Sequence, residues 1–145
     1  MSRFFTIIAV ILISFTAAAA QNVKKAHITV DASELNEIAA NFAFPVEYKT
    51  WEGSNLMVET QVNVPAENKN VINYFFQAGR YNTTATATNG ILNLNNAAAV
   101  KALMTKDGNT IAEEVKVIVY VPADFVAAGN GTFKRADLNT LASAN

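Results

Sequence analysis

The chain has 145 residues, of which 51% are hydrophobic and 16% are charged, and its formal net charge is −1. It contains no cysteine, which excludes thiol chemistry and thiolate metal sites. Its 11 basic and 12 acidic residues form no basic stripe, so nucleic acids and anionic membrane surfaces are poor candidates for partners.

Residues 1–20 have the pattern of a secretory signal peptide. Arg3 precedes an apolar run from Phe4 to Phe15, and Ala17 to Ala20 provide small residues for a cleavage site, which we place after Ala19 or Ala20. A membrane anchor is the alternative interpretation, but the apolar run is shorter than the roughly 20 residues of a spanning helix. We therefore expect export to the periplasm, the cell surface or the medium, with no membrane span in the mature chain.

The remaining length suits one domain followed by a tail. Residues 21–133 are expected to form a single β-rich domain, which is long enough to bury a core. The chain ends in small and polar residues, and we expect a flexible C-terminal tail at residues 134–145.

The domain begins with a weakly alternating segment. Ala26 to Val30 is expected to be the first strand. Residues 31–42 leave two interpretations open. One is a helix that begins with a capping box at Asp31 and Glu34, and the other is a turn followed by a short strand from Glu37 to Phe42. We favour the strand.

Phe44 to Val64 is the stretch around which the chain is expected to be organised. Two runs of alternating apolar and polar residues flank the turn-forming residues 52–55, which predicts an antiparallel β-hairpin with one buried face. Pro45 has no N–H to donate, so we expect this part of the hairpin at a sheet edge. Trp51 is expected at the turn, on the polar face or over the loop.

A helical period follows in residues 67–78. The apolar residues that recur on one helix face are Val71, Ile72, Phe75 and Phe76. Gly79 stands where a left-handed residue would end the helix. We therefore expect one amphipathic helix that lays its phenylalanines on the sheet.

The next hairpin has the strongest local signal in the chain. Tyr81 to Thr88 alternates, Asn89-Gly90 predicts a type I′ turn, and Ile91 to Leu94 returns as the second strand. Ala97 to Met104 is poorly patterned and is expected to form a helical turn or two.

Ile111 to Val121 is the most β-branched run, and its apolar residues fall on both faces. This pattern predicts a central strand that is covered on both sides. One more strand is expected to start at Thr132-Phe133. Together the segments predict a mainly β fold, in which antiparallel hairpins form a sandwich or a short β-solenoid-like domain, with one amphipathic helix around residues 67–78.

The sequence offers no evident catalytic set, and we expect neither catalytic residues, nor a metal, nor a cofactor. His27 is the single histidine, and one histidine without cysteine cannot form a usual zinc site. A lone histidine on a strand is most often a structural residue. The protein is therefore expected not to be an enzyme.

Aromatic side chains are the best candidates for a binding surface. Tyr48, Trp51 and Tyr81, with Tyr74, are expected to form a platform for a ligand such as a sugar, or for another partner. The alternative is that these rings cover the edge of the core with their polar ends in water.

Three stretches resemble known bacterial domains. They are Val-Lys-Lys-Ala-His-Ile-Thr-Val at 23–30, Pro-Val-Glu-Tyr-Lys-Thr-Trp-Glu-Gly at 45–53, and Val-Ile-Val-Tyr-Val-Pro-Ala-Asp-Phe at 117–125, which Gly-Asn-Gly follows. They resemble the auto-transporter adhesin head-like proteins and related adhesin-like β domains of Bacteroidetes-type bacteria. The resemblance implies a signal peptide, strands that end in Val-Pro, and stacked β rungs, and it carries no catalytic residues. The Phe-rich segment around Phe75 departs from that pattern and favours a compact domain.

Three functions follow as expectations. The first is a secreted or envelope module that is adhesin-like and non-catalytic, and that binds a glycan or a cell-surface protein. The second is a hydrolase that uses acidic residues, with Glu47 and Glu59 as candidates. The third is a structural subunit of the cell envelope that self-associates through a strand edge, either near Pro45 or at the Thr-rich strand.

Overall fold

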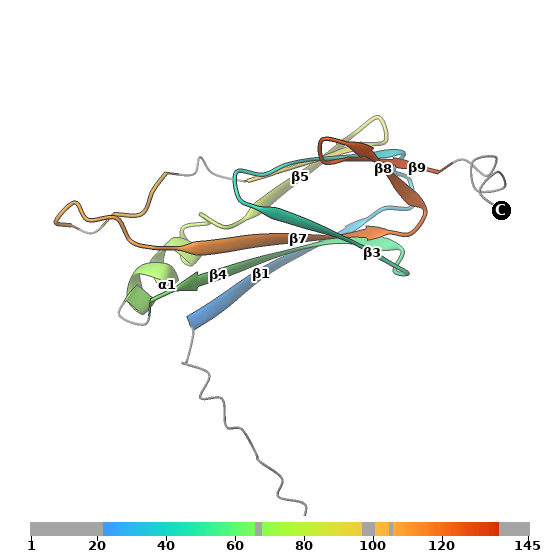
Figure 1. Ribbon diagram of the computed structural model, residues 1–145. Helices are drawn as coiled ribbons and strands as arrows, with labels where there is room; N and C mark the ends of the chain where they lie inside the picture. The colour runs from blue at the N-terminus through green and yellow to red at the C-terminus, as the bar shows by residue number, and fades with distance from the viewer. Residues whose placement is uncertain (1–21, 66–67, 97–100, 105, 137–145) are drawn as a thin grey trace, which may run out of the picture.

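The computed structural model describes residues 22–65, 68–96, 101–104 and 106–136, and Figure 1 shows their arrangement. The fold is mainly β. Two mixed sheets, one of four strands and one of five, pack together as a sandwich, and one short helix lies at one end of it. Among the described residues, no helix has the length and apolar character needed to cross a membrane.

The four-stranded sheet has the spatial order β1-β4-β7-β3. Its strands are β1 (Asn22–Asp31), β4 (Asn55–Val64), β7 (Glu114–Pro122) and β3 (Val46–Trp51). β4 is antiparallel to both β1 and β7, whereas β3 is parallel to β7. β7 lies inside the sheet, as predicted, and Ile118 and Val119 are both buried. The predicted cover on its second face is wrong, because that face points away from the other sheet and Glu114 and Lys116 are exposed on it.

The five-stranded sheet has the spatial order β5-β6-β2-β9-β8. Its strands are β5 (Thr83–Thr88), β6 (Ile91–Asn96), β2 (Glu37–Asn41), β9 (Thr132–Arg135) and β8 (Phe125–Gly129). Only the β2–β6 pair is parallel. β2 confirms the strand interpretation of residues 31–42, because extended backbone there directs Ile38 fully into the core.

The predicted hairpin between β3 and β4 is wrong. The two strands are antiparallel to each other, but β7 lies between them and pairs with both (Figure 1). Residues 52–54 therefore connect two strands that are separated by a third. The physical reason is that alternation fixes which face of a strand is buried but not which strand lies beside it. β3 becomes an edge strand, as Pro45 predicted.

The β5–β6 hairpin and the helix are both confirmed. Asn89 and Gly90 have φ angles of 52° and 76°, as a two-residue turn of type I′ requires. Helix α1 (Lys69–Gln77) ends before Gly79, whose φ is 80°. The Gly79 N–H donates to the Phe76 carbonyl, and the Arg80 N–H donates to the Phe75 carbonyl, which satisfies the last turn.

The helical turn predicted for Ala97–Met104 is wrong in its described part. Residues 97–100 lie outside the described residues. Residues 101–104 are not helical, because Met104 forms an isolated β-bridge with Thr110 and this fixes an extended backbone. The signal peptide, which was expected in residues 1–20, also lies outside the described residues.

Two apolar clusters hold the sandwich together. The larger one lies between the sheets and contains Ala32, Leu35, Ile38, Leu56, Val58, Leu92, Leu94, Val117, Val119, Val121, Phe125 and Phe133. The smaller one lies under the helix and contains Val62, Val64, Ile72, Tyr81 and Val115. Ile72 is the buried residue of α1, and burying such a side chain contributes about 1.5–3 kcal/mol.

β9 continues two residues past the expected end of the domain at 133. Arg135 pairs with Phe125 of β8, and its guanidinium donates to the carbonyls of Leu35 at 2.7 Å and Ala32 at 2.5 Å. The same side chain forms an ion pair with Asp124. Arg135 therefore belongs to the folded sheet, while residues 137–145 of the expected tail lie outside the described residues.

Candidate functional site

The candidate site is the face of the four-stranded sheet that points away from the other sheet, which we call the outer face. Side chains alternate along a strand, and the buried residues Val58 and Val119 define the inner side. The other side chains of these strands form the outer face, which carries Val23, Lys25, His27, Thr29, Asp31, Glu47, Lys49, Trp51, Asn55, Met57, Glu59, Gln61, Asn63, Glu114, Lys116, Ile118 and Tyr120.

Glu59 is at the centre of this face and is only 8% exposed. The Nε2 of His27 lies 2.8 Å from one carboxylate oxygen, and Lys25 Nζ lies 3.4 Å from the other. Gln61 donates a hydrogen bond to the same carboxylate. The pKa of Glu59 is lowered to about 2, chiefly by the hydrogen bond from Gln61. Burial acts in the opposite direction, while His27 and Lys25 lower the pKa further, so the carboxylate stays charged.

A second set of charges connects β3 to β7. Lys116 forms an ion pair with Glu47, and Lys49 Nζ lies 3.7 Å from the other carboxylate oxygen of Glu47. The pKa of Glu47 is lowered, mainly by the hydrogen bond from Lys116. Glu47 and Glu59 are therefore each paired with a lysine of a neighbouring strand.

An aromatic corner, formed by Trp51, Tyr120 and Lys49, lies at one end of the outer face. The Trp51 and Tyr120 rings are 5.9 Å apart with an interplanar angle of 56°. The indole N–H donates to the Asn55 carbonyl at 3.0 Å, and Lys49 Nζ lies 6.0 Å from the centre of the Tyr120 ring. A Cβ on Gly53 would lie 2.5 Å from Trp51 Cζ2, so glycine is what lets the indole lie over the turn. The indole is held before any ligand arrives.

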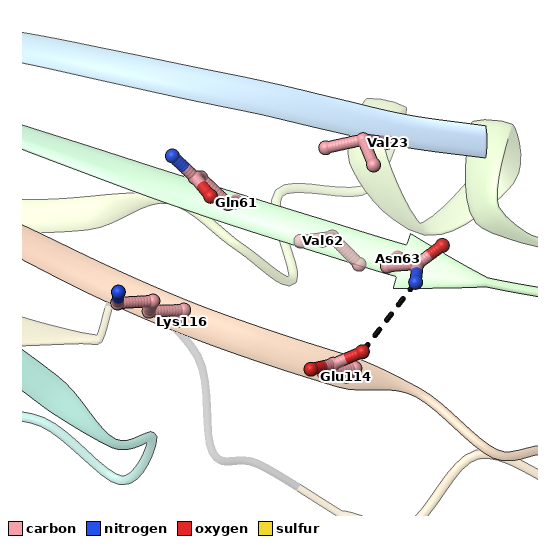
Figure 2. Close-up of a pocket in the computed structure, with 6 residues that line it drawn as sticks. All are labelled: Val23, Gln61, Val62, Asn63, Glu114 and Lys116. Atoms are coloured by element: carbon pink, nitrogen blue, oxygen red, sulfur yellow. Dashed lines mark hydrogen bonds between the residues drawn. The ribbon is translucent and has the colours of Figure 1, made fainter. Parts of the chain in front are cut away.

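A polar pocket of about 150 Å³ lies at the other end of the outer face (Figure 2). It is lined by Val23, Gln61, Val62, Asn63, Glu114 and Lys116, which come from β1, β4 and β7. Asn63 donates to Glu114 across the strands at 3.4 Å. From Met57 to Asn63 the strand rises by about 20 Å. The outer face is therefore an elongated polar strip with aromatic rings at one end.

The structure does not bring the three aromatic residues singled out from sequence into one platform. Trp51 lies on the outer face, but Tyr48 points to the opposite side of β3, where its ring is 4.9 Å from Phe133. Tyr81 is 1% exposed. Tyr74, which was weighed with them, is 66% exposed on α1. The partner of Trp51 is Tyr120, which the sequence reasoning did not select.

Tyr81 belongs to a closed network between the helix and the start of β7. Its hydroxyl donates to Glu113 at 2.7 Å, and Arg80 Nη2 donates to Glu113 at 2.5 Å and to the Lys101 carbonyl at 2.5 Å. Burial, and then the Glu113 carboxylate, raise the pKa of Tyr81. These groups hydrogen-bond one another, and Glu113 also lines a pocket with Phe44, Pro45, Glu114 and Val115.

The sequence indicated the face on which Tyr120 and Glu59 lie, but not the residues beside them. Successive side chains of a strand point to opposite faces, so Tyr120 and Val119 lie on different faces of β7. Tyr120 therefore shares its face with Glu114 and Lys116. The register that sets Tyr120 beside Lys49, and Glu59 beside His27, comes from pairings between distant strands. In the described part of the chain, no group of three His, Cys, Asp or Glu side chains is placed to hold a metal ion.

No family model, no curated protein and no solved structure matches this chain. The likeness to adhesin head-like proteins stays a prediction from sequence.

Proposed function

We propose that this protein is an exported, non-catalytic binding module that recognises a glycan through the outer face of its four-stranded sheet. The observation that carries the proposal is the aromatic corner. Trp51 is fixed by a hydrogen bond and by its packing over Gly53, next to Tyr120. A ring that is already ordered loses little conformational entropy when a ligand binds.

The chemistry of the strip suits a chain of hydroxylated rings. An aromatic side chain presents an apolar surface to the C–H groups of a sugar, while neighbouring polar groups accept and donate hydrogen bonds to its hydroxyls. Gln61, Asn63 and Lys116 provide such groups along the same face, at the end opposite Trp51. The length of the strip favours an extended glycan over a single sugar.

The two carboxylates considered for a hydrolase favour binding over catalysis. Glu59 and Glu47 flank Ile118 in one row of the sheet, so they lie two strand spacings apart. Hydrolysis of a glycosidic bond needs one carboxyl group whose pKa is raised, so that it can donate a proton. Both carboxylates here have lowered pKa values, because lysines and a glutamine stabilise their charged forms.

The test is a fluorescence titration, because Trp51 is the single tryptophan of the chain. The chain from Gln21 onward keeps every described strand and the helix. We expect its emission to change when a panel of bacterial envelope polysaccharides is added. Tyr120→Ala should weaken binding about tenfold or more, which is about 1.4 kcal/mol. Tyr74→Ala, an exposed tyrosine on the helix, is the matched control and should bind as the wild type does.

Three results would count against the proposal. If no polysaccharide changes the emission, or if Tyr120→Ala binds like the wild type, the aromatic corner is not a glycan site. If a bound polysaccharide is cleaved, and the cleavage is lost in Glu47→Gln or Glu59→Gln, the module is catalytic. Export is checked separately by N-terminal sequencing of the secreted protein, which should start at Ala20 or Gln21.

A further inference from the structure

The two open sheets leave four edge strands, and these edges differ in how they are protected. β1 and β3 are the edges of the four-stranded sheet, and β5 and β8 are the edges of the five-stranded sheet. An edge strand presents unpaired N–H and C=O groups that can pair with another chain. Natural proteins block such edges with charges, proline, bulges or short strands.

Three of the four edges carry such a device. β1 carries Lys24 and Lys25, one on each face of the sheet. β3 follows Pro45 directly and carries Lys49. β8 has a register shift between Ala127 and Gly129, which interrupts its pairing pattern.

β5 carries none of these devices. Its sequence from Thr83 to Thr88 is Thr-Thr-Ala-Thr-Ala-Thr, without charge, proline or glycine, and every residue after Thr83 is exposed. Ala85 and Ala87 lie opposite the buried residues Leu94 and Leu92, and therefore on the inner side of the sheet. They are nevertheless exposed, so β5 extends beyond the part of its sheet that the other sheet covers.

The side-chain pattern of β5 is complementary to itself. If two copies pair antiparallel with Thr86 opposite Thr86, then Thr84 lies opposite Thr88 on the outer side, and Ala85 lies opposite Ala87 on the inner side. Directly opposite residues then share a face, as an antiparallel sheet requires. No bulky or charged side chain meets its own copy, and the β-branched threonines suit a strand.

We propose that β5 pairs antiparallel with β5 of a second copy of this chain, so that the two five-stranded sheets join into one continuous sheet. A second copy fits this edge better than a foreign peptide does. Peptide recognition by strand addition takes its specificity from pockets that hold alternate side chains. The alanines and threonines of β5 are too small to form such pockets, whereas they match one another. The contact is a short one, so the dimer is expected to be weak and concentration-dependent.

The test is sedimentation equilibrium of the chain from Gln21 onward, between about 1 μM and about 1 mM. We expect a reversible monomer–dimer equilibrium. Thr86→Lys should weaken the dimer at least about tenfold, because two like charges then lie close together at the twofold axis. Thr29→Lys is the matched control. The same substitution is then at an exposed position of β1, the edge strand that already carries lysines. This variant should dimerise as the wild type does.

Mixing tests the pairing itself. Thr86→Lys and Thr86→Glu should each be monomeric alone and should form a heterodimer together, since opposite charges then face each other. Thermal melting of each variant shows that the fold is intact. A wild type that stays monomeric over the whole range overturns the proposal, and so does a Thr86→Lys variant that dimerises like the wild type. The proposed glycan site is on the other sheet, so Thr86→Lys should leave glycan binding unchanged. A failure of one proposal therefore does not decide the other.

Discussion

The carboxylates of Glu113 and Glu59 are buried to a similar degree, with side chains that are 14% and 11% exposed, but their partners differ in exposure. Glu113 is held by Arg80, whose side chain is 9% exposed, and by the buried hydroxyl of Tyr81. Glu59 is held by Gln61 and by Lys25 and His27, whose side chains are 49% and 48% exposed. The closed Glu113 network connects the segment after the helix to the start of β7. The open Glu59 network orders a surface, and the side chains of Lys25 and His27 remain accessible to water.

The largest expected effect is on the closed network. Glu113→Gln leaves the guanidinium of Arg80 without its counter-charge, and we expect the free energy of unfolding to fall by about 3–5 kcal/mol. Urea unfolding measures this change. Glu114→Gln is the control, since Glu114 is exposed and accepts one long hydrogen bond, from Asn63 at 3.4 Å. Equal effects of the two substitutions would contradict the structural role of Glu113.

A smaller effect is expected for the open network. Glu59→Gln keeps the shape of the side chain but removes its charge, and Lys25 and His27 can regain water because they are exposed. We expect a loss of about 1–2 kcal/mol at neutral pH, after allowing for solvent screening. Urea unfolding again measures the loss. A loss as large as that of Glu113→Gln would remove the distinction between the two networks.

The contribution of Glu59 to stability should depend on pH in the acid range. The pKa of Glu59 is lowered from 4.5 to about 2, so its charged form stabilises the fold above pH 4.5, and this contribution is lost as the pH falls toward 2. The difference in unfolding free energy between the wild type and Glu59→Gln should therefore be constant from neutral pH to about 4.5 and should shrink below that. A difference that does not depend on pH would mean that the charge of Glu59 contributes nothing.

The smallest effect is expected at the rim of the open network. Lys25→Ala removes a half-exposed partner of Glu59, and we expect the unfolding free energy to fall by less than about 1 kcal/mol. The effect should decrease as salt is added, because exposed charges are screened. Thermal melting at low and high salt is the measurement, and a large effect that salt does not change would show that Lys25 stabilises the fold by packing.

Local features of the fold could be predicted from sequence. The β5–β6 hairpin depends on Asn89-Gly90, and helix α1 depends on its own apolar spacing and on Gly79, so neighbouring residues determine both. The central position of β7 followed from its two apolar faces. The pairing of β3 with β7 could not be predicted, because alternation fixes the face that a strand buries but not the strand beside it.

The same limit applies to the candidate site. Trp51 was expected on the polar face or over the loop, and it lies on the polar face of β3 with its indole over the turn. Tyr81 was expected at the surface, but it pairs with Glu113, 32 residues later, and this pairing cannot be read from either segment alone. Tyr120 and Lys49 meet only because β3 and β7 are parallel neighbours. Residues of a site built across strands are therefore found only once the strand order is known.

The most direct test of the central claim is NMR mapping of backbone amide shifts during titration with a polysaccharide that changes the Trp51 emission. The account predicts that the shifts concentrate in β3, β4 and β7, that they are largest around Trp51 and Tyr120, and that they extend toward Asn63. Shifts confined to the five-stranded sheet, or absent around Trp51, would contradict the assignment of the outer face as the binding surface.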